Sequence, residues 1–237
     1  MIRGWTVALS PIDIRKTKPA QVHAVASSIV DRDHWASAKP WSLAPLVTDG
    51  TFCGLRIVTT NDEAVEALVE GAVPGRPCRF GRQATQVLGA PMLDVEVSAD
   101  DFLSLEPESA FVLNFETPTT FRRGSRSMPF PDPQRILHSM QRRWSVCFGD
   151  EALGIIRPIV EPDDIWISDL DGRNVVTRAS NLTVSGFVGR IRYVCETEAS
   201  ARAFNALTAM STLTGVGSYT TRTLGRVARE ETWQPDK

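Results

Sequence analysis

The sequence has no long hydrophobic run. No apolar stretch approaches the roughly 18 residues that a membrane-spanning helix needs, and the N-terminus lacks an apolar signal region of about 7–15 residues. We therefore expect a cytoplasmic protein with no membrane partner. The hydrophobic fraction of 42% and the charged fraction of 23% are ordinary for a globular protein.

Cysteine is scarce and scattered. The four cysteines form no C-x-x-C pair, which excludes a common zinc site and a disulfide framework. Free cysteine is commonly buried. We therefore expect buried free thiols at Cys53, Cys78, Cys147 and Cys195.

Several catalytic motifs are also missing. There is no H-E-x-x-H, no P-loop and no G-x-S-x-G, and no set of carboxylates is placed to hold a metal pair. The pair Gly215-Val-Gly217 lacks the third glycine of a dinucleotide fingerprint and follows an expected helix instead of a strand. We expect no cofactor and no metal, so any phosphodiester cleavage has to rely on side chains.

Basic residues are present but unevenly spread. The net charge of −2 argues against indiscriminate binding of polyanions. Residues 1–108 hold 10 Lys+Arg against 14 Asp+Glu, whereas residues 109–237 hold 16 against 14. Arginine supplies 22 of the 26 basic residues, and its planar guanidinium suits phosphates and bases. A GC-rich genome would produce the same bias.

The densest basic cluster lies within 22 residues and contains a single acid, Asp132. Its six arginines are Arg122, Arg123, Arg126, Arg135, Arg142 and Arg143. Aromatic residues lie nearby at Phe121, Phe130 and Trp144, and this combination fits nucleic-acid binding. The alternative is a solvated arginine face.

The hydrophobic pattern predicts two similar halves, each with the order β-α-β-β-α-β. In residues 1–104 the expected elements are a strand at 5–12, a helix at 19–31, strands at 41–47 and 51–59, a helix at 62–71 and strand-like runs in 80–98. Asp49-Gly50 is the expected hairpin turn, and Asn61 is the expected cap of the second helix.

The polar segment 100–109 is the expected linker. In residues 109–237 we expect strands at 111–116, 164–170, 173–178, 186–195 and 224–229, with helices from Asp132-Pro133 to about 148 and at 197–213. The two short strands would turn at Asp171-Gly172. Two such halves describe an α+β protein made of tandem ferredoxin-like (RRM-like) domains, a fold that hosts many functions.

A glycine-rich segment follows the last expected helix. Gly215, Gly217 and Gly225 would free the backbone to take positive φ and to let a ligand approach closely. Thr220 and Arg222 between them are suited to hydrogen-bonding phosphate. Bare amides beside a basic side chain predict an anion cradle.

The candidates for acid–base chemistry lie near the first helix. His34 can titrate near neutrality and act as a general acid or base, and Lys39 could stabilise charge developing on a phosphorane. Ser27 and Ser28 could hold a nearby hydroxyl. The alternative for His34 is a helix C-terminal cap, where an imidazolium is favoured. His138 has the pattern of a surface or packing residue.

These pieces together resemble one family. The matching segments are His23-Ala-Val-Ala-Ser-Ser-Ile with His34-x4-Lys39-Pro-Trp-Ser-Leu-x-Pro-Leu, the strand 111–121 leading to a helix that ends Arg143-Trp144, Gly186-Phe-Val-Gly-Arg-Ile-Arg-Tyr, and the glycine segment. They follow the order found in CRISPR-associated repeat endoribonucleases of the sixth Cas family, within the RAMP superfamily of RNA-binding proteins.

The resemblance implies tandem ferredoxin-like domains that bind precursor CRISPR repeat RNA and mature guide RNA. It also implies metal-independent cleavage by attack of a ribose 2′-hydroxyl on the adjacent phosphate, leaving a 5′-hydroxyl and a 2′,3′-cyclic or 3′ phosphate. By position, His34 falls at the family's loop histidine and Lys39 falls close to its transition-state lysine.

The chain departs from the family pattern in two places. The family often has a tyrosine on the first helix; here Ser27 or Ser28 lies near that place and His23 lies one turn earlier, and we favour His23 as the second partner of His34. Family loops usually end Gly-x-Gly, whereas this one reads Thr223-Leu-Gly225.

Two other functions stay open. One is a non-catalytic RNA-binding RAMP subunit of a CRISPR effector complex. The other is an ordinary ferredoxin-like metabolic or regulatory protein whose glycine segment binds a small phosphorylated ligand. Other Cas proteins and a second copy of the chain are the remaining candidate partners.

Overall fold

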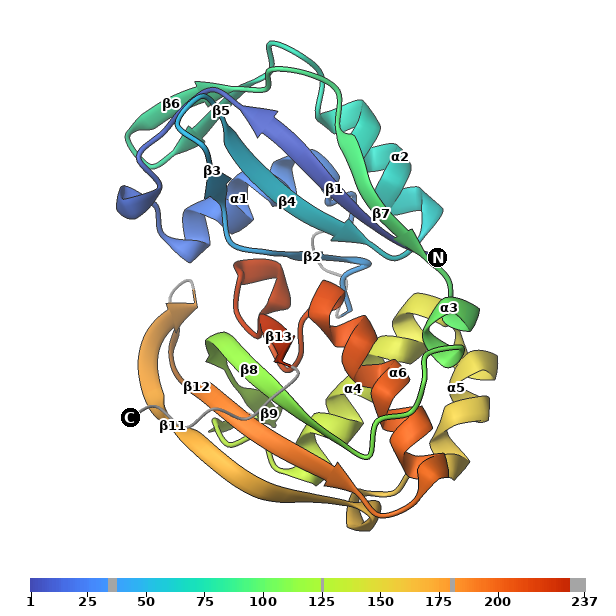
Figure 1. Ribbon diagram of the computed structural model, residues 1–237. Coiled ribbons are helices and arrows are strands. Elements are labelled where there is room, and N and C mark those ends of the chain that lie inside the picture. The colour runs from blue at the N-terminus through green and yellow to red at the C-terminus, as the bar shows by residue number, and fades with distance from the viewer. Residues whose placement is uncertain (34–37, 125, 180–181, 231–237) are drawn as a thin grey trace. The chain divides into compact units, whose positions relative to one another are not determined.

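The computed structural model describes residues 1–33, 38–124, 126–179 and 182–230, and the chain divides into two compact units (Figure 1). Unit 1 comprises Met1–Val97 and Thr221–Thr223, and unit 2 comprises Ser98–Thr220 and Leu224–Lys237. The division falls just before the expected linker. Part of that segment is a short helix, α3 (Ala99–Leu103), which Ser98 begins by accepting a hydrogen bond from the backbone of Asp101.

Unit 1 is a ferredoxin-like sheet with two helices. Its main elements are β1 (Ile2–Leu9), α1 (Pro19–Val30), β2 (Trp41–Leu43), β3 (Val47–Thr48), β4 (Cys53–Thr59), α2 (Asp62–Gly71) and β7 (Met92–Val97). The strands lie in the order β2-β4-β1-β7, with β3 also paired to β4, and every pairing is antiparallel. A short helix η1 (Ile14–Lys16) and a hairpin of β5 (Pro77–Phe80) and β6 (Gln83–Gln86) are added to this core.

Local sequence signals account for the ends of these elements. Pro19 occupies the first turn of α1, where its missing N–H costs nothing. The side chain of Asn61 accepts a hydrogen bond of 2.9 Å from the amide of Ala64, which confirms the expected cap of α2. In the β3–β4 turn, Asp49 Oδ1 accepts from the amide of Thr51 at 2.8 Å, as expected of an Asp-Gly turn.

The core of unit 1 forms where α1 and α2 pack on one face of the sheet. The predicted apolar face of α1 is confirmed, because Val22, Ala26 and Ile29 are all buried in one cluster with residues of β1 and β4. The strand β1 begins three residues earlier than expected, since Ile2 is also buried and pairs with β7.

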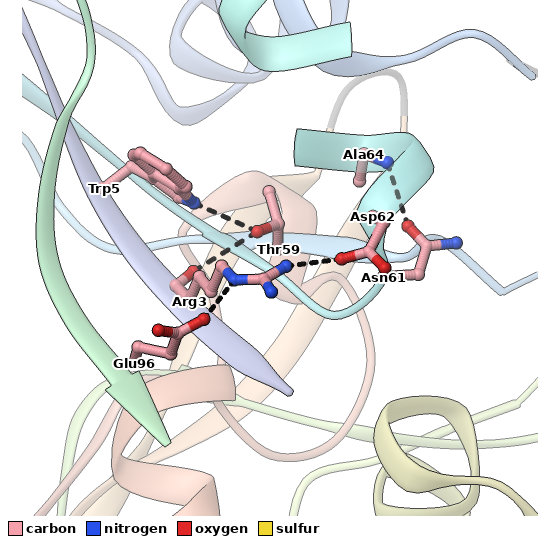
Figure 2. A network of polar contacts seen from close by, with 7 residues as sticks. All are labelled: Arg3, Trp5, Thr59, Asn61, Asp62, Ala64 and Glu96. Carbon is pink, nitrogen blue, oxygen red and sulfur yellow. Dashed lines mark hydrogen bonds and ion pairs between the residues drawn. The ribbon is translucent and has the colours of Figure 1, made fainter. Parts of the chain in front are cut away.

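A polar network joins β1, β7 and the start of α2 on unit 1 (Figure 2). The Arg3 guanidinium donates to Glu96 at 2.5 Å and to Asp62 at 2.6 Å. Trp5 Nε1 donates to Thr59 at 3.1 Å in the same network. The hydrogen bonds from Arg3 hold the pKa of the Asp62 carboxyl below its usual range.

We expect Arg3→Met to destabilise unit 1 near neutral pH and the deficit to shrink in acid. A carboxyl whose pKa is lowered in the folded state contributes stability above its unfolded pKa of about 4 and loses that contribution as pH falls through its folded value. Urea unfolding of both proteins at pH 7 and at pH 3 measures this. If the loss of unfolding free energy were the same at both pH values, its cause would be lost packing of the arginine stem.

Unit 2 repeats the same topology with additions. Its elements are α3, β8 (Ala110–Thr119), β9 (Phe121–Arg123), β10 (Arg126–Met128), α4 (Pro133–Phe148), α5 (Asp150–Ile156), η2 (Arg157–Ile159), η3 (Pro162–Asp164), β11 (Ile165–Ala179), β12 (Leu182–Cys195), α6 (Glu198–Thr214) and β13 (Val227–Glu230). The four-stranded sheet has the order β11-β12-β8-β13, and β9 and β10 form a separate hairpin. The tandem ferredoxin-like fold expected from the sequence is therefore confirmed.

The expected turn at Asp171-Gly172 is wrong. Residues 165–179 form one long strand, β11, in which Gly172 lies opposite Gly189 of β12. An Asp-Gly pair usually signals a hairpin, but here the long alternating strand β12 pairs along the whole of β11. A Cβ on Gly172 would lie 2.3 Å from the ring of Phe187, so this glycine makes room for a side chain that crosses it.

Aromatic packing fills the core of unit 2. The ring of Phe204 on α6 lies 5.3 Å from that of Phe111 on β8 and 5.7 Å from that of Tyr193 on β12. The buried hydroxyl of Tyr193 donates to the carbonyl of Pro131 at 2.6 Å, just before α4 begins. This contact fixes the entry of α4, the helix that carries several of the candidate RNA-binding residues.

Candidate functional site

A buried carboxylate lies at the C-terminal end of α1. Asp31 follows the last residue of the helix, its side chain is only 3% exposed, and its backbone N–H donates to the carbonyl of Ser27. Lys39 Nζ donates to both carboxylate oxygens of Asp31, at 2.9 and 3.0 Å. Ser27 Oγ donates to Oδ2 at 3.0 Å. The structure thus brings two candidate residues, Ser27 and Lys39, to one acid that the sequence analysis missed.

The ammonium of Lys39 is more fully engaged than the sequence suggested. It also donates to the backbone carbonyl of Asp33. An ammonium group has three protons, and the two oxygens of Asp31 with this carbonyl can accept all of them. One signal in the sequence pointed to Asp31: an acid at a helix C-terminus opposes the helix dipole and so calls for a compensating cation.

The remaining candidates on this part of the chain are placed as follows. His34 lies outside the described residues. Its alternative role as a helix cap is therefore untested. Ser28 Oγ donates to the carbonyl of Val25 one turn back, at 2.8 Å. His138 is exposed on α4, as expected for a surface residue.

His23 is held by two contacts within unit 1. Its Nδ1 lies 2.7 Å from the carbonyl oxygen of Thr221, a residue that packs with unit 1. A carbonyl only accepts, so Nδ1 carries the proton. The imidazole also stacks on the buried ring of Trp41, with centroids 5.5 Å apart. His23 therefore contacts Thr221 and Trp41, whereas Ser27 and Lys39 contact Asp31.

The glycine-rich segment 215–225 does not present bare amides at its glycines. The amide of Gly215 donates to Ser211 O at 2.8 Å, that of Gly217 to Ser139 Oγ at 2.8 Å and that of Gly225 to Pro118 O at 3.2 Å. The expectation of bare glycine amides is wrong because α4, α6 and β8 supply their acceptors.

These glycines are needed for backbone packing. All three have positive φ, and a Cβ on Gly225 would lie 2.0 Å from the carbonyl oxygen of Val216. A Cβ on Gly217 would lie 2.5 Å from the carbonyl oxygen of Thr120. The glycines let the segment fold closely upon itself and upon the end of β8.

Two non-glycine residues in the segment also have positive φ: Tyr219 at 68° and Thr223 at 59°. Thr223 stands where the family pattern has a glycine, so the backbone keeps the left-handed conformation although the glycine is gone. This conformation is strained for a β-branched residue. It is held between η4 (Thr220–Arg222) and the buried Leu224.

Arg143 of α4 holds the glycine-rich segment by a hydrogen bond. Its Nη2 donates to Thr220 Oγ1 at 2.7 Å, and burial lowers the pKa of its guanidinium. Ser139, one turn earlier on α4, accepts from Gly217. Two residues four apart on one helix thus hold two points of the glycine-rich segment.

Other arginines of the basic cluster face solvent. Arg122, Arg123 and Arg126 are exposed on the β9–β10 hairpin, and Arg123 lies directly opposite Arg126 in its register. Like charges directly opposite destabilise a strand pair. Arg142 is exposed on α4, whereas Arg135 is paired with Asp132. The hairpin therefore carries concentrated positive charge that an anion would stabilise.

The cysteines are free thiols, and most of them are buried. Burial raises the pKa of the thiols of Cys147 and Cys195 to about 12, so both stay protonated near neutral pH. Cys53 is also a buried free thiol, as expected, and Cys78 is half-buried.

Within the described part of the chain, no three histidine, cysteine or carboxylate side chains gather in a way that could hold a metal ion. No helix among the described residues is long and apolar enough to span a membrane.

One protein family has a model that matches part of this chain. The family model of the CRISPR-associated endoribonuclease Cas6 matches residues 113–227, which run from β8 through the glycine-rich segment to β13. No curated protein matches the sequence.

Solved structures share the fold along the whole chain. A Cas6 product complex matches with a TM-score of 0.80 and 22% identity, covering 97% of this chain and 99% of the other. Thermus thermophilus Cas6 matches with a TM-score of 0.69 and 19% identity, covering 97% and 98%. A RAMP protein binding different RNA substrates matches with a TM-score of 0.55 and 16% identity, covering 97% and 100%. The resemblance found in the sequence is confirmed: residues 113–227 match the Cas6 family model, and the chain shares the fold of solved Cas6 structures.

Proposed function

We propose that this chain binds CRISPR repeat RNA and cleaves it to produce guide RNAs. The Cas6 family match carries the proposal, because it covers both the arginine hairpin and the glycine-rich segment. Similar folds occur in a Cas6 product complex and in a RAMP protein that binds different RNA substrates, which supports RNA as the ligand. Unit 2 concentrates exposed arginines on the β9–β10 hairpin, and this positive charge suits binding of a phosphate backbone.

In the proposed reaction the RNA supplies its own nucleophile. A ribose 2′-hydroxyl attacks the adjacent phosphorus, the bond from phosphorus to the 5′-oxygen breaks, and a 2′,3′-cyclic phosphate and a 5′-hydroxyl result. A base removes the proton of the 2′-hydroxyl, and an acid protonates the leaving 5′-oxygen. Because nucleophile and phosphate belong to one molecule, positioning supplies much of the rate and no metal is required.

His34 is the proposed general acid or base, and His23 is the proposed second partner. The proposal for His34 comes from its place in the sequence pattern, since it lies outside the described residues. His23 has a ring fixed by Thr221 and Trp41, which suits a group that has to meet a phosphate in one orientation.

RNA binding is proposed for two groups of residues, the exposed arginines and the glycine-rich segment. The exposed guanidinium groups of Arg122, Arg123, Arg126 and Arg142 would pair with backbone phosphates. Gly215, Gly217 and Gly225 would act indirectly, by fixing the backbone that presents Arg222. Thr220 is buried and its hydroxyl accepts from Arg143, so the expectation that it bonds a phosphate directly is not carried forward. Their amides are already bonded within the protein, so we assign them no direct contact with RNA.

A single 2′-deoxy substitution tests the proposed chemistry. We expect repeat RNA that lacks the 2′-hydroxyl just 5′ of the scissile phosphate to bind normally and to resist cleavage. EDTA should leave cleavage of the unmodified RNA unchanged, as measured by single-turnover gel assays. Metal-dependent cleavage of the deoxy substrate would overturn the mechanism, and failure to bind any repeat RNA would overturn the function.

A further inference from the structure

An aspartate is energetically unfavourable at the position of Asp31. Its side chain is only 3% exposed, and its carboxylate lies at the C-terminus of α1, where the helix dipole already places negative charge. A neutral residue would end the helix without either cost. Lys39 Nζ and Ser27 Oγ both donate to the carboxylate there.

Lys39 has also lost much of its contact with water. Its side chain is 15% exposed, and its ammonium reaches both oxygens of Asp31 and the carbonyl of Asp33. An ammonium bonded in this way has to give up partners before it can contact an RNA phosphate. Breaking one side of a buried ion pair leaves an uncompensated charge, which is strongly unfavourable.

The ion pair joins two points of the chain that are eight residues apart. Asp31 is fixed at the end of α1, and Lys39 directly precedes Pro40 and the buried strand β2. The pair therefore joins the end of α1 to the start of β2. The residues between these two points include His34 in the sequence.

We propose that Asp31 is a positioning residue for RNA cleavage and that Lys39 acts through it instead of contacting the RNA. The Asp31–Lys39 clamp, made of these two residues and Ser27, joins the end of α1 to the residues before β2, which flank His34 in the sequence. This inference rests on the proposed function. It reassigns Lys39 from stabilising charge on the phosphorane to fixing the end of α1 relative to the start of β2.

A double-mutant cycle tests the clamp. We expect Asp31→Asn and Lys39→Met each to slow single-turnover cleavage of repeat RNA about 100-fold, because a displacement of about 1 Å can cost that much. The double variant should be no slower than either single variant, because both changes break the same contact. The affinity for uncleaved 2′-deoxy repeat RNA should stay within about threefold of wild type, which a general loss of structure would not allow.

Two results would overturn the clamp. If Lys39 acts directly on the phosphate, Asp31→Asn should leave the rate unchanged or raise it while Lys39→Met abolishes cleavage. If the two residues act independently, their rate losses should multiply in the double variant. A wild-type protein that cleaves no repeat RNA would refute the proposed function, whereas normal cleavage by Asp31→Asn refutes only the clamp.

A matched pair in the same unit serves as the control. Lys16 and Asp13 also form a lysine–aspartate ion pair, of 3.1 Å, but Lys16 is 77% exposed. Asp13→Asn with Lys16→Met should leave the cleavage rate unchanged. Should Asp31→Asn not fold, Ser27→Ala and Lys39→Arg carry the test, since both keep the charges. Each should slow cleavage more than threefold at unchanged RNA affinity, and unchanged rates would overturn the proposal.

Discussion

His34→Ala should abolish detectable cleavage of repeat RNA while its affinity for that RNA stays within a few-fold of wild type. A general acid or base contributes about 10²–10⁴-fold to a rate. The exposed arginines that we assign to the RNA backbone lie on the β9–β10 hairpin and on α4 and are untouched by this change. Single-turnover cleavage and filter binding, measured on the same repeat RNA, separate the two effects.

His138→Ala is the matched control, since His138 is an exposed histidine on α4 outside the proposed chemistry. It should cleave at the wild-type rate. If wild type and His34→Ala both bind repeat RNA and neither cleaves it, the chain is a non-catalytic RNA-binding subunit. If neither binds repeat RNA at moderate salt, the glycine-rich segment has to serve a small phosphorylated ligand instead.

Gly225→Ala should lower the free energy of unfolding by about 2–5 kcal/mol in the absence of RNA. About 1–2 kcal/mol comes from placing an alanine at positive φ, here 72°, and about 1–3 kcal/mol comes from overpacking. The new Cβ would lie 2.0 Å from the backbone carbonyl of Val216, which has no side-chain freedom with which to move away. Chemical denaturation of the RNA-free protein measures the loss.

Gly75→Ala separates the two contributions, because Gly75 has a φ of 82° but no heavy atom within 4 Å of its new Cβ. We expect it to cost about 1–2 kcal/mol, the backbone share alone. A Gly225→Ala protein of unchanged stability that no longer binds repeat RNA would contradict the structural role. That outcome would instead restore the prediction that RNA lies directly against the glycine backbone.

Local signals in the sequence were sufficient where the contact that they specify lies between residues close together in the chain. Asn61 caps α2 as expected, and Asp132 caps α4, the helix that was expected to begin at Asp132-Pro133. A side chain that accepts from an amide three residues later needs no distant partner. The Asp171-Gly172 turn failed for the opposite reason. Whether an Asp-Gly pair turns or stays extended depended on the length of β12, the strand with which it pairs.

The same distinction between local and long-range contacts applies to the candidate site. Sequence spacing drew attention to Ser27 and Lys39, but it did not reveal that both of them contact Asp31. It grouped six arginines into one cluster, of which Arg143 turns inward to Thr220 and Arg135 pairs with Asp132. Side-chain direction depends on the packing of neighbouring elements, so spacing alone leaves it open.

The sequence by itself determined the two-fold repeat of β-α-β-β-α-β and the family resemblance, because hydrophobic periodicity and short motifs are properties of the chain taken in order. The tertiary structure alone decided what the glycines of residues 215–225 do. Their amide partners Ser139, Ser211 and Pro118 come from three different elements, and only folding brings them to these amides. A segment that looked open to an anion is therefore a closely packed support for the residues that it presents.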